Sequence, residues 1–376
     1  MRSLIVLVMA ATTTAVGCNM ASDQDGRTGS GLLIGSDVSC PSCSIVFDSV
    51  ATLEGAYFSG PTTTIARGPT GTFYLVDAGD ALLKAYGSDG RSVRQIGRRG
   101  GGPGEYEMVR NVLVSDDGSV LVLDGRLGRL SAFSEHGEFL RSTQVPVFAG
   151  AAMPAVLLSD GALVVNARPV TVGDAGHALN VIDQNGNVSL SFDGTSADPR
   201  RRWVQRRLLW ARSNGELLVA RPYTFTIDVY ARDYTKESSI TRVAEWVPSE
   251  QPDQQPSDGV FDRPFTPALM EIWEDERGLL WLYMMLPSPL WEPGPPMQEV
   301  MSEQGIDEEA YRALGSRPRV ETIIEVVDLN AGHLLTRMRL DNPVGAPFGG
   351  GYFARSVEDS SLGEPSLQIS RVQLKR

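Results

Sequence analysis

Short apolar runs alternate with glycine-bearing turns through most of the chain. The clearest unit begins at the turn Asp116-Asp117-Gly118, and an apolar run over 119–123 follows it. A second run covers 129–133, and a second turn at 134–137 leads into a last run over 138–141. Alternating apolar residues between tight turns are typical of antiparallel β-strands. With a strand before the first turn, the unit predicts four strands, a to d in chain order.

This unit recurs along the chain. The glycine of the a–b turn returns in five copies, at Gly71, Gly118, Gly161, Gly215 and Gly278. Repeats of roughly 40–50 residues with four strands each are typical of propeller blades. A sixth, degenerate copy covers 352–357 and 367–374 but has no clear outer strand, whereas the run from Ile45 to Leu53 has no unit of its own. We therefore predict an all-β, six-bladed β-propeller over 45–376, its ring closed by pairing of the N- and C-terminal strands.

One segment between the first two units carries a family resemblance. The run from Ile96 to Tyr106, Ile-Gly-Arg-Arg-Gly-Gly-Gly-Pro-Gly-Glu-Tyr, resembles the inter-blade signature of NHL-type repeats. It also resembles the signature of the bacterial lipoprotein "6-bladed β-propeller" family, and 54–58 echoes it weakly. The resemblance implies the fold and no single chemistry. Because neither Lys-Ser, Lys-Thr nor a helix follows the glycines, we interpret 97–104 as a turn between blades and not as a phosphate loop.

The first residues are typical of an export signal. Met1-Arg2 supplies positive charge, the apolar run from Leu4 to Ala11 is too short to span a bilayer, and small residues precede Cys18. This pattern predicts a lipoprotein signal peptide over 1–18, with Cys18 lipidated and anchored to a bacterial membrane. An ordinary signal peptide with an incidental cysteine is the alternative. In either case the pattern predicts an extracytoplasmic location, in the periplasm or at the outer membrane.

Residues 19–44 are rich in Ser, Gly and Asp, which predicts a flexible tether. The tether contains Cys40 and Cys43, the remaining cysteines if Cys18 carries lipid. Outside the cytoplasm such a pair favours a local disulfide. Its two-residue spacing leaves a redox role open, but zinc would require further ligands that are missing nearby.

The overall composition limits the classes of molecule that the protein is expected to bind. Hydrophobic residues make up 42% of the chain and charged residues 21%, which suits a soluble globular domain. The net charge of −12 repels polyphosphate, so we expect no nucleic-acid partner.

Strand order predicts which loops share a face. The a–b and c–d turns lie on one side, the short-turn face, and the b–c and d–a loops lie on the other, the long-loop face. All the long irregular segments belong to the second face: 97–108, 124–128, 166–176, 193–205, 243–267 and 284–320. Long loops cost little stability and often carry recognition, so we predict that the long-loop face is functional. Its proline-rich insertions, and a helix expected over 308–314, would form a lid or simply staple blades.

Basic residues collect in these loops. They suit a carboxylate, a phosphate or an acidic sugar, and an adjacent tryptophan suits stacking; the candidates are Arg98, Arg99, Arg126, Arg168, Arg201, Trp203 and Arg221. The alternative is that they form salt bridges with nearby carboxylates. Asp77 and Asp124 end equivalent b strands, where they would contact a ligand or cation, or cap a turn.

Two functions remain open. The first is a tethered binding or scaffold module for a protein, peptide or anionic saccharide, with no cofactor. The second is a lactonase-like hydrolase or lyase that holds a cation such as Ca²⁺ in the central channel. The chain has only three histidines, two of them in c–d turns, and it lacks a nucleophile-elbow motif. We therefore predict no catalytic residue and no metal ligand.

Overall fold

The computed structural model describes residues 27–28, 31–58, 64–148, 154–169, 177–194, 206–247, 264–293, 301–302, 305–306, 320–358 and 365–376. Within these ranges the structure is all β, and none of them contains a helix long and apolar enough to cross a membrane. The predicted signal peptide with Cys18 and the helix expected over 308–314 lie outside the described residues. Two short strands, β26 (Met301–Ser302) and β27 (Gly305–Ile306), pair in the insertion before that helix.

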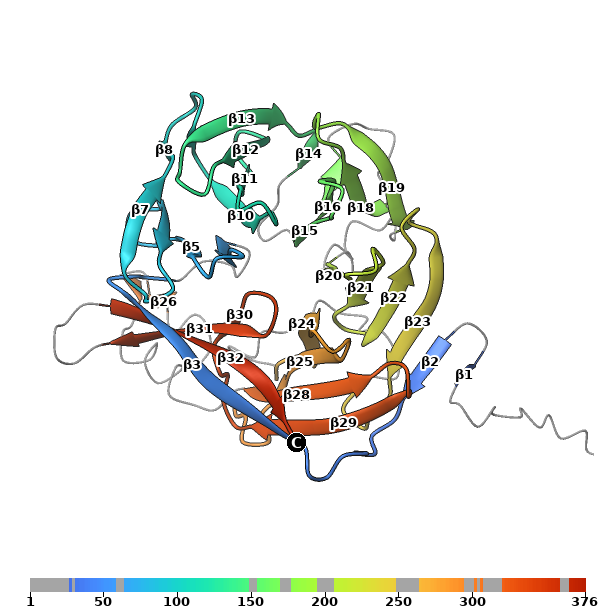
Figure 1. Ribbon diagram of the computed structural model, residues 1–376. Coiled ribbons are helices and arrows are strands. Elements are labelled where there is room, and N and C mark those ends of the chain that lie inside the picture. Colours follow the sequence, from blue (N-terminus) through green and yellow to red (C-terminus); the bar gives the residue numbers. More distant parts are fainter. Residues whose placement is uncertain are drawn as a thin grey trace, which may run out of the picture.

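Six blades surround a central axis (Figure 1). Each blade is an antiparallel sheet of four strands, as predicted, and its a strand lies next to the axis. Blade 1 consists of β4 (Ile65–Arg67), β5 (Phe73–Val76), β6 (Leu83–Tyr86) and β7 (Ser92–Ile96); blade 2 of β10 (Val109–Val114), β11 (Val120–Asp124), β12 (Arg129–Phe133) and β13 (Phe139–Gln144); blade 3 of β15 (Ala155–Leu157), β16 (Leu163–Asn166), β18 (His177–Ile182) and β19 (Val188–Gly194).

The second half of the ring repeats the arrangement. Blade 4 consists of β20 (Leu208–Ala211), β21 (Leu217–Arg221), β22 (Thr226–Tyr230) and β23 (Lys236–Arg242); blade 5 of β24 (Ala268–Glu274), β25 (Leu280–Pro287), β28 (Val320–Asp328) and β29 (His333–Leu340); blade 6 of β30 (Ala346–Pro347), β31 (Tyr352–Glu358), β32 (Pro365–Lys375) and β3 (Ser44–Glu54). Two short pairs lie outside the blades. In the linker between blades 1 and 2, β8 (Arg98–Arg99) pairs with β9 (Glu105–Tyr106). In the linker before blade 3, β14 (Val147–Phe148) pairs with β17 (Arg168–Pro169), which belongs to the b–c loop of blade 3.

The two ends of the chain close the ring. The N-terminal strand β3 is the outer strand of blade 6 and pairs antiparallel with β32, with Ile45 opposite Leu374 and Leu53 opposite Leu367. The predicted closure is confirmed. Covering β32 in this way removes a sheet edge that would otherwise be exposed.

The core consists of six apolar clusters, one between each pair of neighbouring blades. Successive strand residues point to opposite faces of a sheet. In β16, for example, Leu163 and Val165 pack toward blade 2, whereas Val164 packs toward blade 4. Both faces of a blade are therefore buried, which explains why the apolar runs are nearly continuous.

The segment predicted as a tether differs from the prediction. Strand β1 (Arg27–Thr28) pairs with β2 (Gly31–Ile34), and β2 adds in parallel to the outer edge of β23. The backbone N–H groups of Ser39 and Cys40 then donate to the carbonyls of Leu334 and Leu335 in blade 5. We call residues 31–43 the N-terminal strap. The polar composition of this segment did not predict the strap, because the strap is held by backbone hydrogen bonds, which do not depend on apolar side chains.

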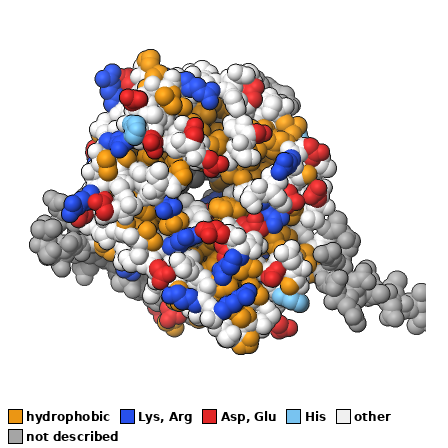
Figure 2. Space-filling model, in the orientation of Figure 1, with side chains coloured by type: hydrophobic (Ala, Val, Ile, Leu, Met, Phe, Trp, Pro, Cys, Tyr) orange, Lys and Arg blue, Asp and Glu red, His pale blue; other side chains and the backbone are white. Residues whose placement is uncertain are grey.

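The two faces of the ring are those that strand order predicts. The C-terminus comes directly after β32, a c strand, so it lies on the short-turn face. Figure 1 draws this end of the chain toward the viewer, so Figures 1 and 2 both show the short-turn face. Figure 2 shows that the ring is hollowed at its centre on this side. Strands β23 and β25 run in the same direction, so the segments that follow Arg242 and Pro287 both begin on the long-loop face.

Candidate functional site

In the loop between blades 1 and 2, the carboxylate of Glu105 is bound by other residues of the same loop. Glu105 accepts from the backbone N–H of Gly102 at 2.7 Å and pairs with Arg98, Nε to Oε1, at 2.8 Å. These hydrogen bonds hold the pKa of Glu105 below its ordinary value. Gly97 has φ +64°, and a Cβ there would lie 2.8 Å from the carbonyl oxygen of Gly104. The glycine-rich run is therefore a tight inter-blade turn, in which Arg98 and Arg99 are exposed.

Arg126 has a similar environment. It lies in the exposed b–c turn of blade 2, and its Nε contacts Glu107 Oε2 at 2.8 Å. Because both arginine side chains are largely exposed, the two ion pairs contribute little to stability. Arg98 and Arg126 thus form salt bridges on the long-loop face and remain open to solvent.

Asp77 and Asp124 are both buried caps. Asp124 accepts from the backbone N–H groups of Arg126 and Leu127 through Oδ1, at 2.8 and 2.9 Å, and from Glu107 through Oδ2 at 2.6 Å. Asp77 accepts from the N–H of Gly79 at 2.8 Å and contacts Lys84 Nζ at 3.3 Å. Both carboxylates therefore cap a turn, and Asp77 adds an ion pair with Lys84.

Arg221 takes part in a buried charge network between blades 3 and 4. Its guanidinium pairs with Asp193 at 2.6 Å and with the fully buried Asp228. Asp193 also pairs with the buried Arg207, and Lys236 Nζ lies 2.8 Å from Asp228 Oδ1. Arg221 is therefore neutralised inside the protein.

Three further candidates lie outside the described residues: the side chain of Arg168, whose backbone belongs to β17, and the whole of Arg201 and Trp203. Within the described ranges, no three His, Cys, Asp or Glu side chains are grouped so as to hold a metal ion. Cys40 and Cys43 are joined by a disulfide in the strap.

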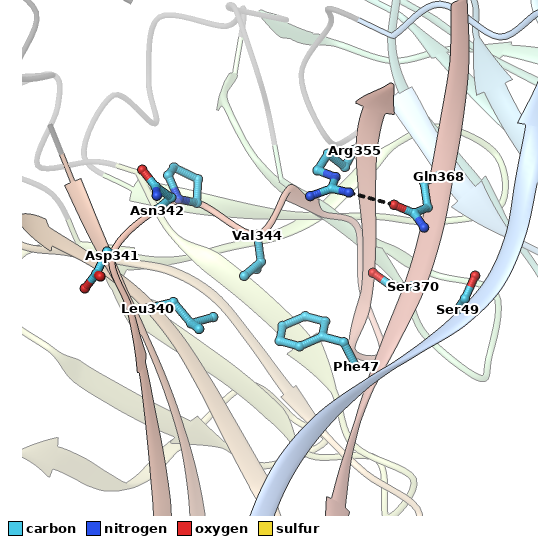
Figure 3. A pocket seen from close by; sticks show the side chains of 10 residues that line it. Phe47, Ser49, Leu340, Asp341, Asn342, Val344, Arg355, Gln368 and Ser370 are labelled. Carbon is cyan, nitrogen blue, oxygen red and sulfur yellow. Dashed lines mark hydrogen bonds between the residues drawn. The ribbon is translucent and has the colours of Figure 1, made fainter. Parts of the chain in front are cut away.

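A groove between blades 5 and 6, which the sequence did not predict, has a volume of about 490 Å³ (Figure 3). It opens where the linker after β29 leaves toward β30. Half-buried Phe47, Leu340 and Val344 supply apolar surface. Polar groups line the rest: Ser49, Asp341, Asn342, Arg355, Gln368 and Ser370. We call this cavity the blade 5–6 groove.

Arg355 gives this groove a positive charge. One of its Nη atoms donates to Gln368 Oε1 at 2.9 Å, as Figure 3 shows. Among the described residues, no carboxylate lies within ion-pair distance of Arg355. Gln368 thus orients the guanidinium without neutralising it, which leaves donors for an external carboxylate.

The groove was missed for a topological reason. Phe47 and Ser49 come from the N-terminal strand, whereas the other lining residues lie beyond position 339. Only ring closure brings them together. The predicted pairing of the chain ends was the one available signal, but it gave no register for β3 on β32.

The blade count and order now allow comparison with known proteins. A family model described as "6-bladed beta-propeller" matches residues 70–230, from the first turn of blade 1 to the third strand of blade 4. The chain is a 6-bladed β-propeller. The family resemblance of the 96–106 segment is thereby confirmed at the level of the fold.

Solved structures resemble this propeller over almost their whole length. A member of the duf4221 family from Bacteroides vulgatus is 12% identical, with a TM-score of 0.60 over 89% of this chain and 99% of that one. A "Putative exported protein" from Bacteroides fragilis is 14% identical, with a TM-score of 0.57 over 92% of this chain and 99% of that one. At these identities the likeness concerns the fold. No curated protein sequence matches the propeller significantly.

Proposed function

We propose that this propeller is an extracytoplasmic binding module that takes its ligand on the long-loop face. The export signal ending at Cys18, the disulfide of the strap and the likeness to a protein described as exported support the location. Lipidation of Cys18 would tether the ring to a membrane through the segment before the strap.

The blade 5–6 groove carries the proposal. It combines an apolar floor with one oriented guanidinium that lacks a carboxylate partner among the described residues. Such surfaces suit an extended segment that buries apolar side chains and presents an acidic group. Of the predicted ligand classes, an acidic peptide or a protein segment fits best. Arg98 and Arg126 lie on the same face, where they offset the negative charges of Glu105 and Glu107 that would otherwise repel such a ligand.

Fluorescence anisotropy with labelled peptides tests the proposal. One probe alternates Glu and Leu, and its matched control alternates Lys and Leu. We expect the acidic probe to bind and Arg355→Ala to weaken its binding by roughly ten- to a hundredfold, because a charge-assisted hydrogen bond contributes about 1.5–3 kcal/mol. Arg98→Ala and Arg126→Ala should mainly slow association and reduce its salt dependence.

Arg91→Ala is the matched control, because Arg91 is an exposed arginine in a c–d turn on the short-turn face. It should leave the affinity for the acidic probe unchanged. Equal affinity for the two probes, or equal loss in the Arg91 and Arg355 variants, would refute the site.

A further inference from the structure

Two arginines stack on one tyrosine at the junction of blades 6 and 1, on the short-turn face. Arg67, the last residue of β4, places its Cζ 5.0 Å from the ring centroid of Tyr352, the first residue of β31. Arg371 on β32 places its Cζ 5.3 Å from the same centroid. Arg67 also lies 6.0 Å from the ring of Phe73. The three side chains come from two blades and three strands.

The positive charge of this stack is barely compensated. Within the described part of the chain, no carboxylate lies in ion-pair range of Arg67. Among the described carboxylates, Arg371 pairs with Glu276 alone, Nη2 to Oε1 at 3.5 Å, and the Glu276 side chain is 89% exposed. A pair of that kind contributes almost nothing. Elsewhere on the same face, Arg212 contacts two carboxylates within 2.6 Å or less. The uncompensated positive charge of Arg67 and Arg371 is therefore a local feature of a chain whose net charge is −12.

Stacking prepares both guanidinium groups for a ligand. A guanidinium that lies over an aromatic ring uses its planar face, which leaves its N–H edge for bidentate contact with a carboxylate. The ring also restricts the arginine side chains before binding, so less conformational entropy is lost when a ligand arrives. Stacked arginines of this kind are therefore suited to oxyanions.

A cavity of about 340 Å³ adjoins the stack at Arg371. Polar groups supply most of its exposed wall, because the stacked indoles of Trp273 and Trp281 beneath them, with centroids 5.5 Å apart, are only 2% and 1% exposed. Arg277, Asp275, Glu276 and Gln373 supply polar groups. Gly351 allows its backbone to pack closely against Trp273, because a Cβ at this position would lie 3.1 Å from the indole nitrogen. Figure 2 shows basic and acidic side chains side by side over this part of the face.

The mixed wall decides the class of ligand. Sugar hydroxyls both donate and accept, so they can pair with the carboxylates of Asp275 and Glu276 as well as with the donors of the wall, whereas the acceptor oxygens of a phosphate dianion would leave both carboxylates without a donor. We propose that Arg67, Tyr352 and Arg371 form a second ligand site that binds the carboxylate of an acidic saccharide, with the neighbouring cavity receiving its sugar ring. This site goes beyond the proposed function, because it lies on the opposite face from the blade 5–6 groove.

Isothermal titration calorimetry tests the site with trigalacturonate as the probe. We expect trigalacturonate to bind, and maltotriose, its uncharged counterpart, to bind at least tenfold more weakly. Arg67→Ala and Arg371→Ala should each lower the affinity for trigalacturonate by roughly tenfold, whereas Arg91→Ala on the same face should not change it. Tyr352→Phe keeps the ring and should retain binding, but Tyr352→Leu should lose most of it.

Several results would overturn the site. They are no binding of trigalacturonate, equal losses in the Arg67 and Arg91 variants, or equally tight binding of inorganic phosphate. The Arg355→Ala variant separates the two proposals, since it should weaken the acidic peptide and leave trigalacturonate unaffected. Loss of the acidic peptide in Arg67→Ala, with trigalacturonate retained, would also contradict the assignment.

Discussion

Arg242 on β23 and Glu325 on β28 form a bidentate ion pair that joins blades 4 and 5. The Nε–Oε2 distance is 2.6 Å and the Nη2–Oε1 distance is 2.8 Å, and the two side chains are 2% and 0% exposed. Arg242 also donates to the carbonyl oxygen of Ile34 at 3.1 Å, which holds β2 in place. Arg337 shares Glu325 at 2.7 Å and stacks on Trp246. One carboxylate thus anchors two blades and, through Arg242, the strap.

Glu325→Gln is expected to destabilise the propeller by about 3–5 kcal/mol, because it leaves the buried Arg242 without its counter-charge. Urea denaturation followed by circular dichroism measures the change in the free energy of unfolding. Glu107→Gln, which removes the exposed partner of Arg126, is the matched control and should change it by less than about 1 kcal/mol. Similar values for the two variants would show that the buried pair has no special role.

Leu53→Ala tests ring closure. Leu53 on β3 is 0% exposed and packs between blades 6 and 1. Removing its side chain should cost about 2–5 kcal/mol, and the free energy of unfolding should fall by that amount. Val50 lies on the same strand at a β-bulge and is 38% exposed, so Val50→Ala should have almost no effect. If the urea concentration at the midpoint of unfolding is the same for both variants and the wild type, β3 does not close the ring.

The sequence made the architecture predictable for a local reason. Each a–b turn contains a glycine with positive φ, such as Gly118 at +84° and Gly161 at +83°, and these turns separate apolar runs whose period is unambiguous. The outer strand of blade 6 was predictable because the run from Ile45 to Leu53 had no partner in its own part of the chain.

The sites were less predictable, because they depend on contacts between distant segments. Arg221 ends the apolar strand β21, and the sequence gave no sign that Asp193 and Asp228 would neutralise it. The stacking of Arg67 and Arg371 on Tyr352 joins β4 to the last two strands of the chain, and no spacing in the sequence records it.

Tyr106→Phe tests the family signature between blades 1 and 2. The buried hydroxyl of Tyr106 donates to the carbonyl oxygen of Ile96 at 3.0 Å and accepts from the N–H of Leu83 at 2.8 Å. Its loss leaves two buried backbone groups unpaired, so the free energy of unfolding should fall by about 1–3 kcal/mol. Tyr57→Phe, at an exposed tyrosine, is the control for loss of a hydroxyl. Equal effects in the two variants would mean that the signature tyrosine acts through its ring alone.

Glu271 on the innermost strand of blade 5 should make stability depend on pH. Burial raises its pKa to about 7, although the positive charge of Arg206 opposes the shift. Because the folded protein holds this proton more tightly than the unfolded chain, stability is lost as the pH rises from about 4.5 through 7. The full penalty, roughly 3 kcal/mol, should be present above that range.

Glu271→Gln removes the titrating group while keeping the shape of the side chain. The variant should match the wild type near pH 4.5 and become more stable than it by roughly 3 kcal/mol at pH 8. Urea denaturation at pH 5, 6, 7 and 8 measures this difference, with Glu54→Gln as the control at an exposed glutamate in β3. A difference between Glu271→Gln and wild type that stays constant across these pH values would mean that the carboxyl of Glu271 titrates normally in the folded ring.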